Sequence, residues 1–249
     1  MIIMNFENLR VVVTGASRGI GEELARGLAA QGARIVAIGR DPRRLDQLRR
    51  VHPEWEVMEG SLDAATDREQ LADEILGRGS VDVLINNAGT QTIVDARSPV
   101  DWEILGREIE VNLGAPIHLI HLLLPSLLER RTDAPMAAIV NVTSGLALAP
   151  KAAAAPYCAT KAGLRSYSKA LRRQLRDTPV RVVEALPSLV KTDMTAGRND
   201  DAISAKECAE EMIAGMRADR DEIYVGKVKL LRAVMRIAPS IGERKMRDA

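Results

Sequence analysis

Short runs of apolar, largely β-branched residues alternate with helical segments along most of the chain. The runs "RVVVT", "RIVAIG", "VDVLIN", "AAIVNV" and "VRVVEAL" are each bounded by polar or glycine-containing segments. Short strands that are apolar on both faces and separated by helices are typical of a parallel sheet covered on both sides. Because crossovers between parallel strands are right-handed, this order predicts an α/β fold with a doubly wound parallel sheet.

The pattern predicts strands over residues 10–14, 33–40, 54–60, 81–89, 136–144, 180–187 and 222–225. It predicts helices to about residue 31 and over 41–52, 65–76 and 155–176, with a long, interrupted helix over 101–131. Asp41 and Pro42 are typical of a helix start. We found no repeat or linker, so we expect one domain over 1–249. Polar residues 193–219 are expected to form a mobile substrate lid, and 226–249 a basic C-terminal segment.

Charge and cysteine content exclude several classes of protein. Lys and Arg number 35 and Asp and Glu 34, which leaves a net charge of +1 and no electrostatic reason to expect a nucleic-acid partner. The most apolar stretch, residues 117–128, is too short for a transmembrane segment. Cys158 and Cys208 form no CxxC pair, so a reducing cytoplasm is expected. His118 and His121 have no convincing third ligand, and we expect no metal.

The segment "TGASRGIG" joins the first strand to the first helix. Gly15, Gly19 and Gly21 would permit a tight turn and a close approach of the backbone to a pyrophosphate. The N–H groups at the start of the helix favour the same anion. In this position the spacing predicts a nucleotide site rather than a purely structural turn.

Two arginines bear on which dinucleotide binds. The second strand ends in "AIGR", so that Arg40 stands where NAD-binding proteins usually have an acid, and Arg18 lies in the glycine turn. Guanidinium groups suit a 2′-phosphate, which favours NADP(H) over NAD(H). The alternative is that both are solvated surface arginines, and Asp41 weakens the case for the phosphate.

Tyr157 and Lys161 are four residues apart on a predicted helix and therefore share a face. A nearby ammonium is expected to lower the pKa of a tyrosine, which could then exchange a proton with a carbonyl or alcohol oxygen. Ser144, at the end of the fifth strand, could hydrogen-bond the same oxygen. The alternative for an isolated YxxxK is a half-buried tyrosine beside a surface lysine.

The motifs "TGASRGIG", "NNAG", "VNLGAP", "VTSG" and "YCATK" occur in that order. In this combination the chain resembles the short-chain dehydrogenase/reductase superfamily, which has a Rossmann fold. The resemblance implies a catalytic tetrad in which Tyr157 is the acid/base, Ser144 positions the substrate oxygen, Lys161 acts on the tyrosine and holds the nicotinamide ribose, and Asn112 supports a water. It also implies a homodimer or homotetramer.

The resemblance assigns further positions to the cofactor. The adenosine ribose would lie against Asn87, Ala88 and Gly89, and the carboxamide against Val190 and Thr192. With the glycine turn, the expected cofactor residues are Gly15, Ser17, Arg18, Gly19, Ile20, Gly21, Arg40, Leu62, Asn87, Ala88, Gly89, Tyr157, Lys161, Pro187, Val190 and Thr192. Two positions depart from the family pattern: Ser61 stands where an Asp usually contacts adenine, and Ser188 where a Gly usually follows Pro187.

The expected function is that of an NADP(H)-dependent oxidoreductase that interconverts a ketone or aldehyde and an alcohol. One alternative is a 3-oxoacyl-thioester reductase acting on acyl carrier protein or coenzyme A. The other is an NADP-binding regulatory protein without turnover, against which the intact tetrad argues.

Overall fold

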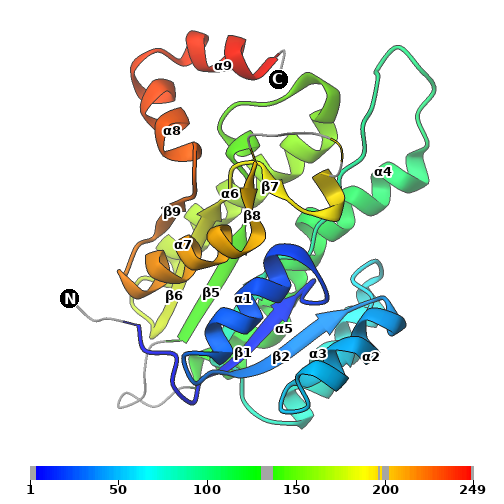
Figure 1. Ribbon diagram of the computed structural model, residues 1–249, viewed down its shortest axis with the longest axis vertical. Helices are drawn as coiled ribbons and strands as arrows, with labels where there is room; N and C mark the ends of the chain where they lie inside the picture. The colour runs from blue at the N-terminus through cyan, green and yellow to red at the C-terminus, as the bar shows by residue number, and fades with distance from the viewer. Residues whose placement is uncertain (1–3, 130–136, 196, 198–201, 248–249) are drawn as a thin grey trace.

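The computed structural model describes residues 4–129, 137–195, 197 and 202–247. Its centre is a seven-stranded sheet in the order β3-β2-β1-β4-β5-β6-β9, in which every pairing is parallel (Figure 1). The predicted α/β, doubly wound sheet is confirmed, and the chain forms one domain. The strand order reverses between β1 and β4, which is where such sheets bind ligands. The strands are β1 (Arg10–Thr14), β2 (Arg34–Gly39), β3 (Glu56–Glu59), β4 (Val83–Asn86), β5 (Ala137–Val142), β6 (Val180–Leu186) and β9 (Glu222–Tyr224).

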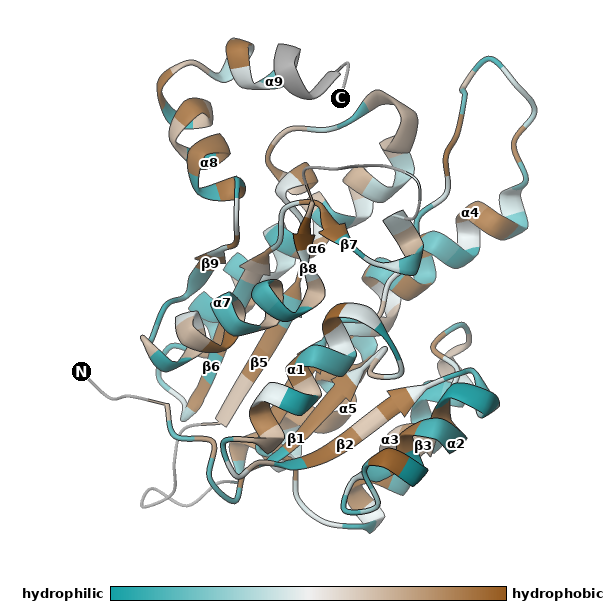
Figure 2. Cartoon of the chain, in the orientation of Figure 1, coloured by the Kyte–Doolittle hydropathy of each residue, from teal (hydrophilic) through white to brown (hydrophobic). Residues whose placement is uncertain are grey.

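Helices cover both faces of the sheet because its strands are apolar on both sides, as Figure 2 shows by the brown strands. In β1, Val11 and Val13 belong to one hydrophobic cluster and Val12 to the other. The first cluster includes side chains of α1 (Gly19–Ala29), α2 (Pro42–Val51) and α7 (Ala205–Arg217). The second includes side chains of α3 (Ala65–Gly77), α5 (Ala115–Leu128) and α6 (Ala155–Gln174).

The long helix predicted over 101–131 is interrupted at the position of Asn112. It consists of α4 (Trp102–Ile109), a π-helical turn (Glu110–Gly114) and α5. Pro116 has no N–H to donate to the carbonyl four residues earlier, which favours the change of hydrogen bonding at this point. Residues 130–131 of this prediction, and residue 136 of the predicted fifth strand, lie outside the described residues.

The stretch Trp102–Leu128 has the length and composition of a membrane span, but 44% of its most apolar window is buried inside the structure. Leu119, Ile120, Leu123 and Leu127 of α5 belong to the second cluster. The apolar character of α5 is therefore explained by its packing against the sheet.

Asp41 caps α2 as predicted. Its carboxylate accepts hydrogen bonds from the backbone N–H groups of Arg43 and Arg44 at 3.0 and 3.5 Å, and Pro42 occupies the first turn. These bonds satisfy N–H groups that have no partner within the helix. The cap fixes the start of α2 beside the carboxyl end of β2, and so places Arg44 near the glycine turn.

The segment after β6 is more regular than its sequence suggests. A small parallel ladder joins β7 (Val190–Lys191) to β8 (Ile203–Ser204), and Ser204 with Glu207 forms a capping box that starts α7. Cys208, Met212 and Met216 of α7 are buried in the first cluster. The mobile lid predicted over 193–219 therefore stays a prediction only for the residues before α7. Of these, residues 196 and 198–201 lie outside the described residues.

The basic C-terminal segment forms α8 (Val228–Ile237) and α9 (Pro239–Arg247), which project from the sheet at the top of Figure 1. Residues 248–249 of it lie outside the described residues. Lys229 pairs with Glu211 at 2.6 Å, and the Arg232 guanidinium lies 4.4 Å from the centre of the Tyr224 ring. Leu230 and Ile237 are 65% and 86% exposed. The start of α8 is thus held by the buried Val228 and by these two charged contacts, while Leu230 and Ile237 further along it are exposed.

Candidate active site

The glycine turn takes the conformation that its sequence predicts. Gly15 and Gly19 have φ of +66° and +59°, which side chains other than glycine rarely adopt. A Cβ on Gly21 would lie 2.2 Å from the carbonyl oxygen of Gly15. Gly21 therefore allows α1 to start directly against the turn, so that the start of the helix faces the groove described below.

The ends of β1 and β4 are joined by side-chain hydrogen bonds. The hydroxyl of Thr14 accepts hydrogen bonds from the backbone N–H groups of Asn87 and Ala88, both at 3.0 Å. The side-chain amide of Asn87 donates to the carbonyl oxygen of Thr14 at 2.9 Å. These bonds hold the "NNAG" segment against the glycine turn at the point where the strand order reverses.

A single groove runs along this edge of the sheet, past the glycine turn to α6. Of the residues predicted to bind the cofactor, the groove is lined by Gly15, Ser17, Arg18, Gly19, Ile20, Arg40, Leu62, Asn87, Ala88, Gly89, Tyr157, Lys161, Pro187 and Thr192. Gly21 lies beneath the turn, and Val190 is buried in β7. Asn112 and Ser144 do not line the groove, but both contact residues that do.

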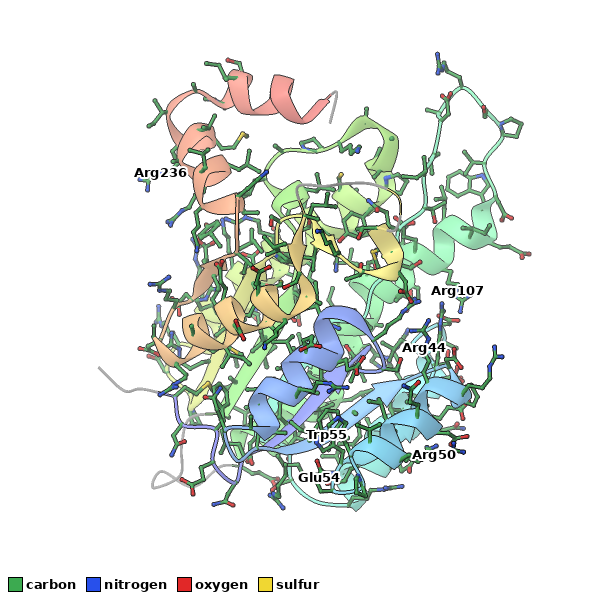
Figure 3. All side chains as sticks on the ribbon, viewed as in Figure 1. Arg44, Arg50, Glu54, Trp55, Arg107 and Arg236 are labelled. Atoms are coloured by element: carbon green, nitrogen blue, oxygen red, sulfur yellow. The ribbon has the colours of Figure 1, made fainter. Side chains whose placement is uncertain are left out.

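One carboxylate bridges two arginines at the end of the groove. Oδ2 of Asp193 accepts hydrogen bonds from Arg18 at 3.0 Å and from Arg44 at 2.9 Å, and both arginines hold the pKa of Asp193 below its usual value. Arg44 and Arg107 are labelled on this side of the molecule in Figure 3. Arg18 and Arg44 thus share one carboxylate of the chain, whereas Arg40 lines the groove with an exposed side chain.

The two departures from the family pattern have local consequences. Leu62 lines the groove next to Asp63, whose carboxylate forms an ion pair with Arg107 of α4 at 2.6 Å. A Cβ on Gly226 would lie 2.6 Å from the hydroxyl oxygen of Ser188. Asp63 is thus engaged by α4, and Ser188 packs closely on the loop that leads to α8.

Tyr157 and Lys161 lie on one face of α6, as predicted. Nζ of Lys161 is 5.7 Å from the centre of the Tyr157 ring and donates a hydrogen bond to the carbonyl oxygen of Val142 at 2.9 Å. Ser144, at the end of β5, starts a short 3₁₀ turn in which its hydroxyl accepts a hydrogen bond from the N–H of Leu146 at 3.1 Å.

The expected lowering of the tyrosine pKa is not found. Burial raises the pKa of Tyr157 to about 12, and a hydrogen bond with Ser144 only partly opposes it. Burial also lowers the pKa of Lys161 to about 8. The prediction was wrong because it considered the ammonium charge and not desolvation, which disfavours the charged form of both side chains. Near neutral pH the tyrosine is a proton donor.

Asn112 lies on the π-helical turn, and its side chain is held at both ends. Its Oδ1 accepts from the N–H of Thr90 at 2.9 Å, and its Nδ2 donates to the carbonyl oxygen of Thr90 at 2.8 Å. Nδ2 also donates to the hydroxyl of Thr160 at 3.3 Å. Asn112 thereby connects the segment after β4 to the helix that carries Tyr157 and Lys161.

Sequence reasoning missed Asp193, which lines the groove, and Arg44 and Thr14, which contact residues that line it. Arg44 and Asp193 were overlooked because their side chains come together only in the fold, and the cap at Asp41 was the one local signal for the position of Arg44. The hydroxyl of Thr14 is satisfied by a segment more than 70 positions away in the chain, so nothing local pointed to it.

The two histidines of α5 have separate partners. Nδ1 of His118 accepts from Arg68 at 3.1 Å, and Nε2 of His121 lies 3.3 Å from the hydroxyl of Tyr167. In the described part of the chain, no group of three or more His, Cys, Asp or Glu side chains is placed to hold a metal ion.

The glycine turn, the groove at the strand reversal and the Tyr–Lys pair together define an oxidoreductase with a dinucleotide-binding fold. The short chain dehydrogenase family matches residues 10–203. The chain therefore belongs to the short chain dehydrogenase family, as its motifs predicted.

Several relatives match most of the chain. An uncharacterized oxidoreductase, DltE, of Bacillus subtilis is 37% identical over 241 residues, which are 94% of each chain. An L-xylulose reductase of Caenorhabditis elegans is 29% identical and covers 91% of this chain and 90% of its own. A short chain dehydrogenase structure from Burkholderia cenocepacia, in complex with NADP, has a TM-score of 0.86 at 24% identity, covering 98% of this chain and 99% of its own. At that identity the structure supports the fold alone.

Proposed function

We propose that the chain is an NADP(H)-dependent oxidoreductase that interconverts a carbonyl compound and an alcohol, with Tyr157 as the acid/base. The observation that carries this proposal is the common groove, in which Tyr157 and Lys161 of α6 open onto the same space as the glycine turn. A nucleotide binding along the turn would extend toward the tyrosine. The names of the L-xylulose reductases among the relatives agree with a carbonyl/alcohol reaction.

The site combines a glycine turn with a pair of arginines. Gly15 lets the turn pack directly against the segment after β4, since a Cβ there would lie 2.9 Å from the Ala88 Cα. Arg18 and Arg44 already hold the Asp193 carboxylate, which stands in for an anion at the position expected of the 2′-phosphate.

The bound cofactor would supply the hydride to the carbonyl carbon. Tyr157, whose pKa of about 12 keeps it protonated, donates its phenolic proton to the carbonyl oxygen. The Ser144 hydroxyl, just after the carboxyl end of β5, orients that oxygen. The ammonium of Lys161 stabilises the phenolate that remains, and Asn112 holds Thr90 and Thr160 in place beside it. The resting tyrosine is therefore in the protonated form that carbonyl reduction needs.

The substrate end is bounded by loops that follow three strands. The N–H of Val94 donates to the carbonyl oxygen of Ala153 at 3.1 Å, which ties the loop after β4 to the loop after β5. Met194 lines the groove from the segment after β7. The three loops, rather than the catalytic residues, are therefore expected to select the substrate.

The direct test is oxidation of NADPH by the purified protein in the presence of a panel of ketones, aldehydes and 3-oxoacyl thioesters, with NADH in parallel. We expect turnover of at least one simple carbonyl compound and a preference for NADPH. Turnover only of the thioesters would identify the thioester reductase instead. Tight NADPH binding without turnover of any compound would favour a regulatory protein.

We also propose a homodimer or homotetramer in a reducing cytoplasm, formed through α5 and α6. Leu122, Leu124 and Tyr167 on these helices are only partly buried, and Leu128 is 38% exposed. Cys158 and Cys208 are buried free thiols, and the absence of a disulfide between them agrees with a reducing compartment. Light scattering of the purified protein should give a mass of two or four chains, and replacing Leu124 with Asp should give a single chain.

A further inference from the structure

A buried acid on α4 has no part in the scheme above. Glu108 is fully buried. Its Oε2 accepts a hydrogen bond from the N–H of Thr92 at 2.6 Å, while its Oε1 is buried without a hydrogen-bond partner among the described residues. Burying a carboxylate in this way is unfavourable unless another charge or a donor compensates it. Glu108 therefore requires an explanation beyond its bond to Thr92.

Glu108 and Asn112 hold one short segment from the same helical region. Asn112 binds the backbone of Thr90 at both N–H and carbonyl, and Glu108 binds the N–H of Thr92. A Cβ on Gly89, at the start of that segment, would lie 3.1 Å from Oδ1 of Asn112 and 3.6 Å from Nζ of Lys161. Polar groups of α4 and of α6 thus converge on residues 89–92.

Lys161 is the charge that lacks a counter-ion here. Its side chain is 97% removed from solvent, because only 3% of the residue is exposed, and its Nζ donates to the carbonyl of Val142. Among the described residues no carboxylate forms an ion pair with it. Burial lowers the pKa of Lys161, and the negative charge of Glu108 raises it. The same charge raises the pKa of Tyr157 and of Cys158, and Lys151 lowers that of Cys158.

We propose that Glu108 is a positioning residue of the active site, whose buried carboxylate holds the segment after β4 and is the counter-charge of the buried Lys161. The inference rests on the proposed function, which gives Lys161 its role. Glu108 does not contact the reacting atoms. It acts through Lys161 and Tyr157. The same carboxylate that faces the charge of Lys161 also holds residues 89–92 in place through the N–H of Thr92.

The test follows the titration of Lys161 by NMR of the isotope-labelled lysine side chains, with the signal assigned by Lys161→Arg. Glu108→Gln removes the charge but keeps an oxygen for the N–H of Thr92. We expect this variant to lower the Lys161 midpoint by about one pH unit. Glu108→Asp, which keeps the charge, should largely restore it. Glu103→Gln, an exposed acid of the same helix, should leave it unchanged. An unchanged midpoint in Glu108→Gln overturns the proposal.

A second variant provides the same measurement if Glu108→Gln does not fold. Glu108→Leu removes the buried carboxylate and should also lower the Lys161 midpoint. An unchanged midpoint in this variant would again overturn the proposal. The titration needs no turnover. If the wild type reduces carbonyl compounds but the Lys161 midpoint does not move in these variants, the proposed function stands and the role of Glu108 is refuted.

Discussion

Nζ of Lys161 lies 5.7 Å from the centre of the Tyr157 ring and donates a hydrogen bond to the backbone carbonyl of Val142. The two side chains therefore share a buried space without an ion pair between them. Burial disfavours the charged form of both side chains: it lowers the pKa of Lys161 to about 8 and raises the pKa of Tyr157 to about 12. A protonated phenol next to an ammonium is suited to donate a proton and then to have its phenolate stabilised.

This relationship predicts the pH dependence of the reaction. Lys161 loses its charge as the pH rises through about 8, and the phenolate left by proton transfer is then less stable. We expect kcat/KM for carbonyl reduction to be highest below that pH and to fall above it. A steady-state pH profile with NADPH saturating checks this, and a rate that stays constant to pH 10 contradicts the assignment.

Stability should also depend on the charge of Lys161. Its folded pKa of about 8 lies below the ordinary 10.5, so the unfolded chain binds more protons between these values and stability rises with pH across that window. Below pH 8 the buried ammonium lowers the free energy of unfolding by up to about 3 kcal/mol. Lys161→Met should therefore be more stable than wild type at pH 7, and the difference should shrink toward pH 10. Urea denaturation at several pH values measures it.

Replacement of Tyr157 by Phe should abolish proton donation while keeping the ring. We expect kcat for carbonyl reduction to fall by about a hundredfold to ten-thousandfold, with NADPH binding little changed. Tyr167→Phe, on the same helix and outside the groove, is the matched control and should keep full activity. Equal rates in Tyr157→Phe and wild type would show that another group is the acid.

The arginine pair should determine the choice of cofactor. Arg18→Ala and Arg44→Ala are each expected to weaken NADPH binding by about tenfold to a hundredfold and to leave NADH binding nearly unchanged. Arg43→Ala, next in the same helix, serves as the control. Fluorescence titration with both nucleotides measures the ratio. If the variants bind NADPH and NADH more weakly by the same factor, the arginines bind the pyrophosphate rather than the 2′-phosphate.

Asp193 competes with the phosphate in this scheme. Its ion pairs are about half exposed, and such pairs are weak because water and salt screen them. Asp193→Asn should therefore tighten NADPH binding by about two- to fivefold. NADH affinity should not change, since that nucleotide has no phosphate to compete. A weaker affinity for NADPH in this variant would mean that Asp193 supports the cofactor site.

A buried ion pair behind the site should matter for stability. Glu184 of β6 is fully buried, pairs with Arg165 of α6 and accepts a hydrogen bond from Thr143 at 2.8 Å. Arg165→Ala leaves the carboxylate without its cation and should lower the free energy of unfolding by about 3–5 kcal/mol. Arg176→Ala, which removes an exposed pair with Asp177, should change it by less than about 1 kcal/mol.

The local pattern of the chain was sufficient for the strands, the cap at Asp41 and the face shared by Tyr157 and Lys161. Periodicity and capping act over a few residues, so they are legible in one segment at a time. The same reasoning placed residues 193–219 in a mobile lid, because the packing of α7 against α1 involves residues far away in the chain. It also assigned a lower pKa to Tyr157, since burial is not visible in a motif.

The sequence by itself determined the doubly wound sheet, the glycine turn at its point of reversal and the order of the active-site motifs. Only the tertiary structure decided which charges meet: Arg44 with Arg18 at Asp193, Asp63 with Arg107, and Glu108 near Lys161. Electrostatic energies depend on distance in space and on the local loss of water. Both are properties of the packed molecule, and so the tertiary structure determines the charge state of this site.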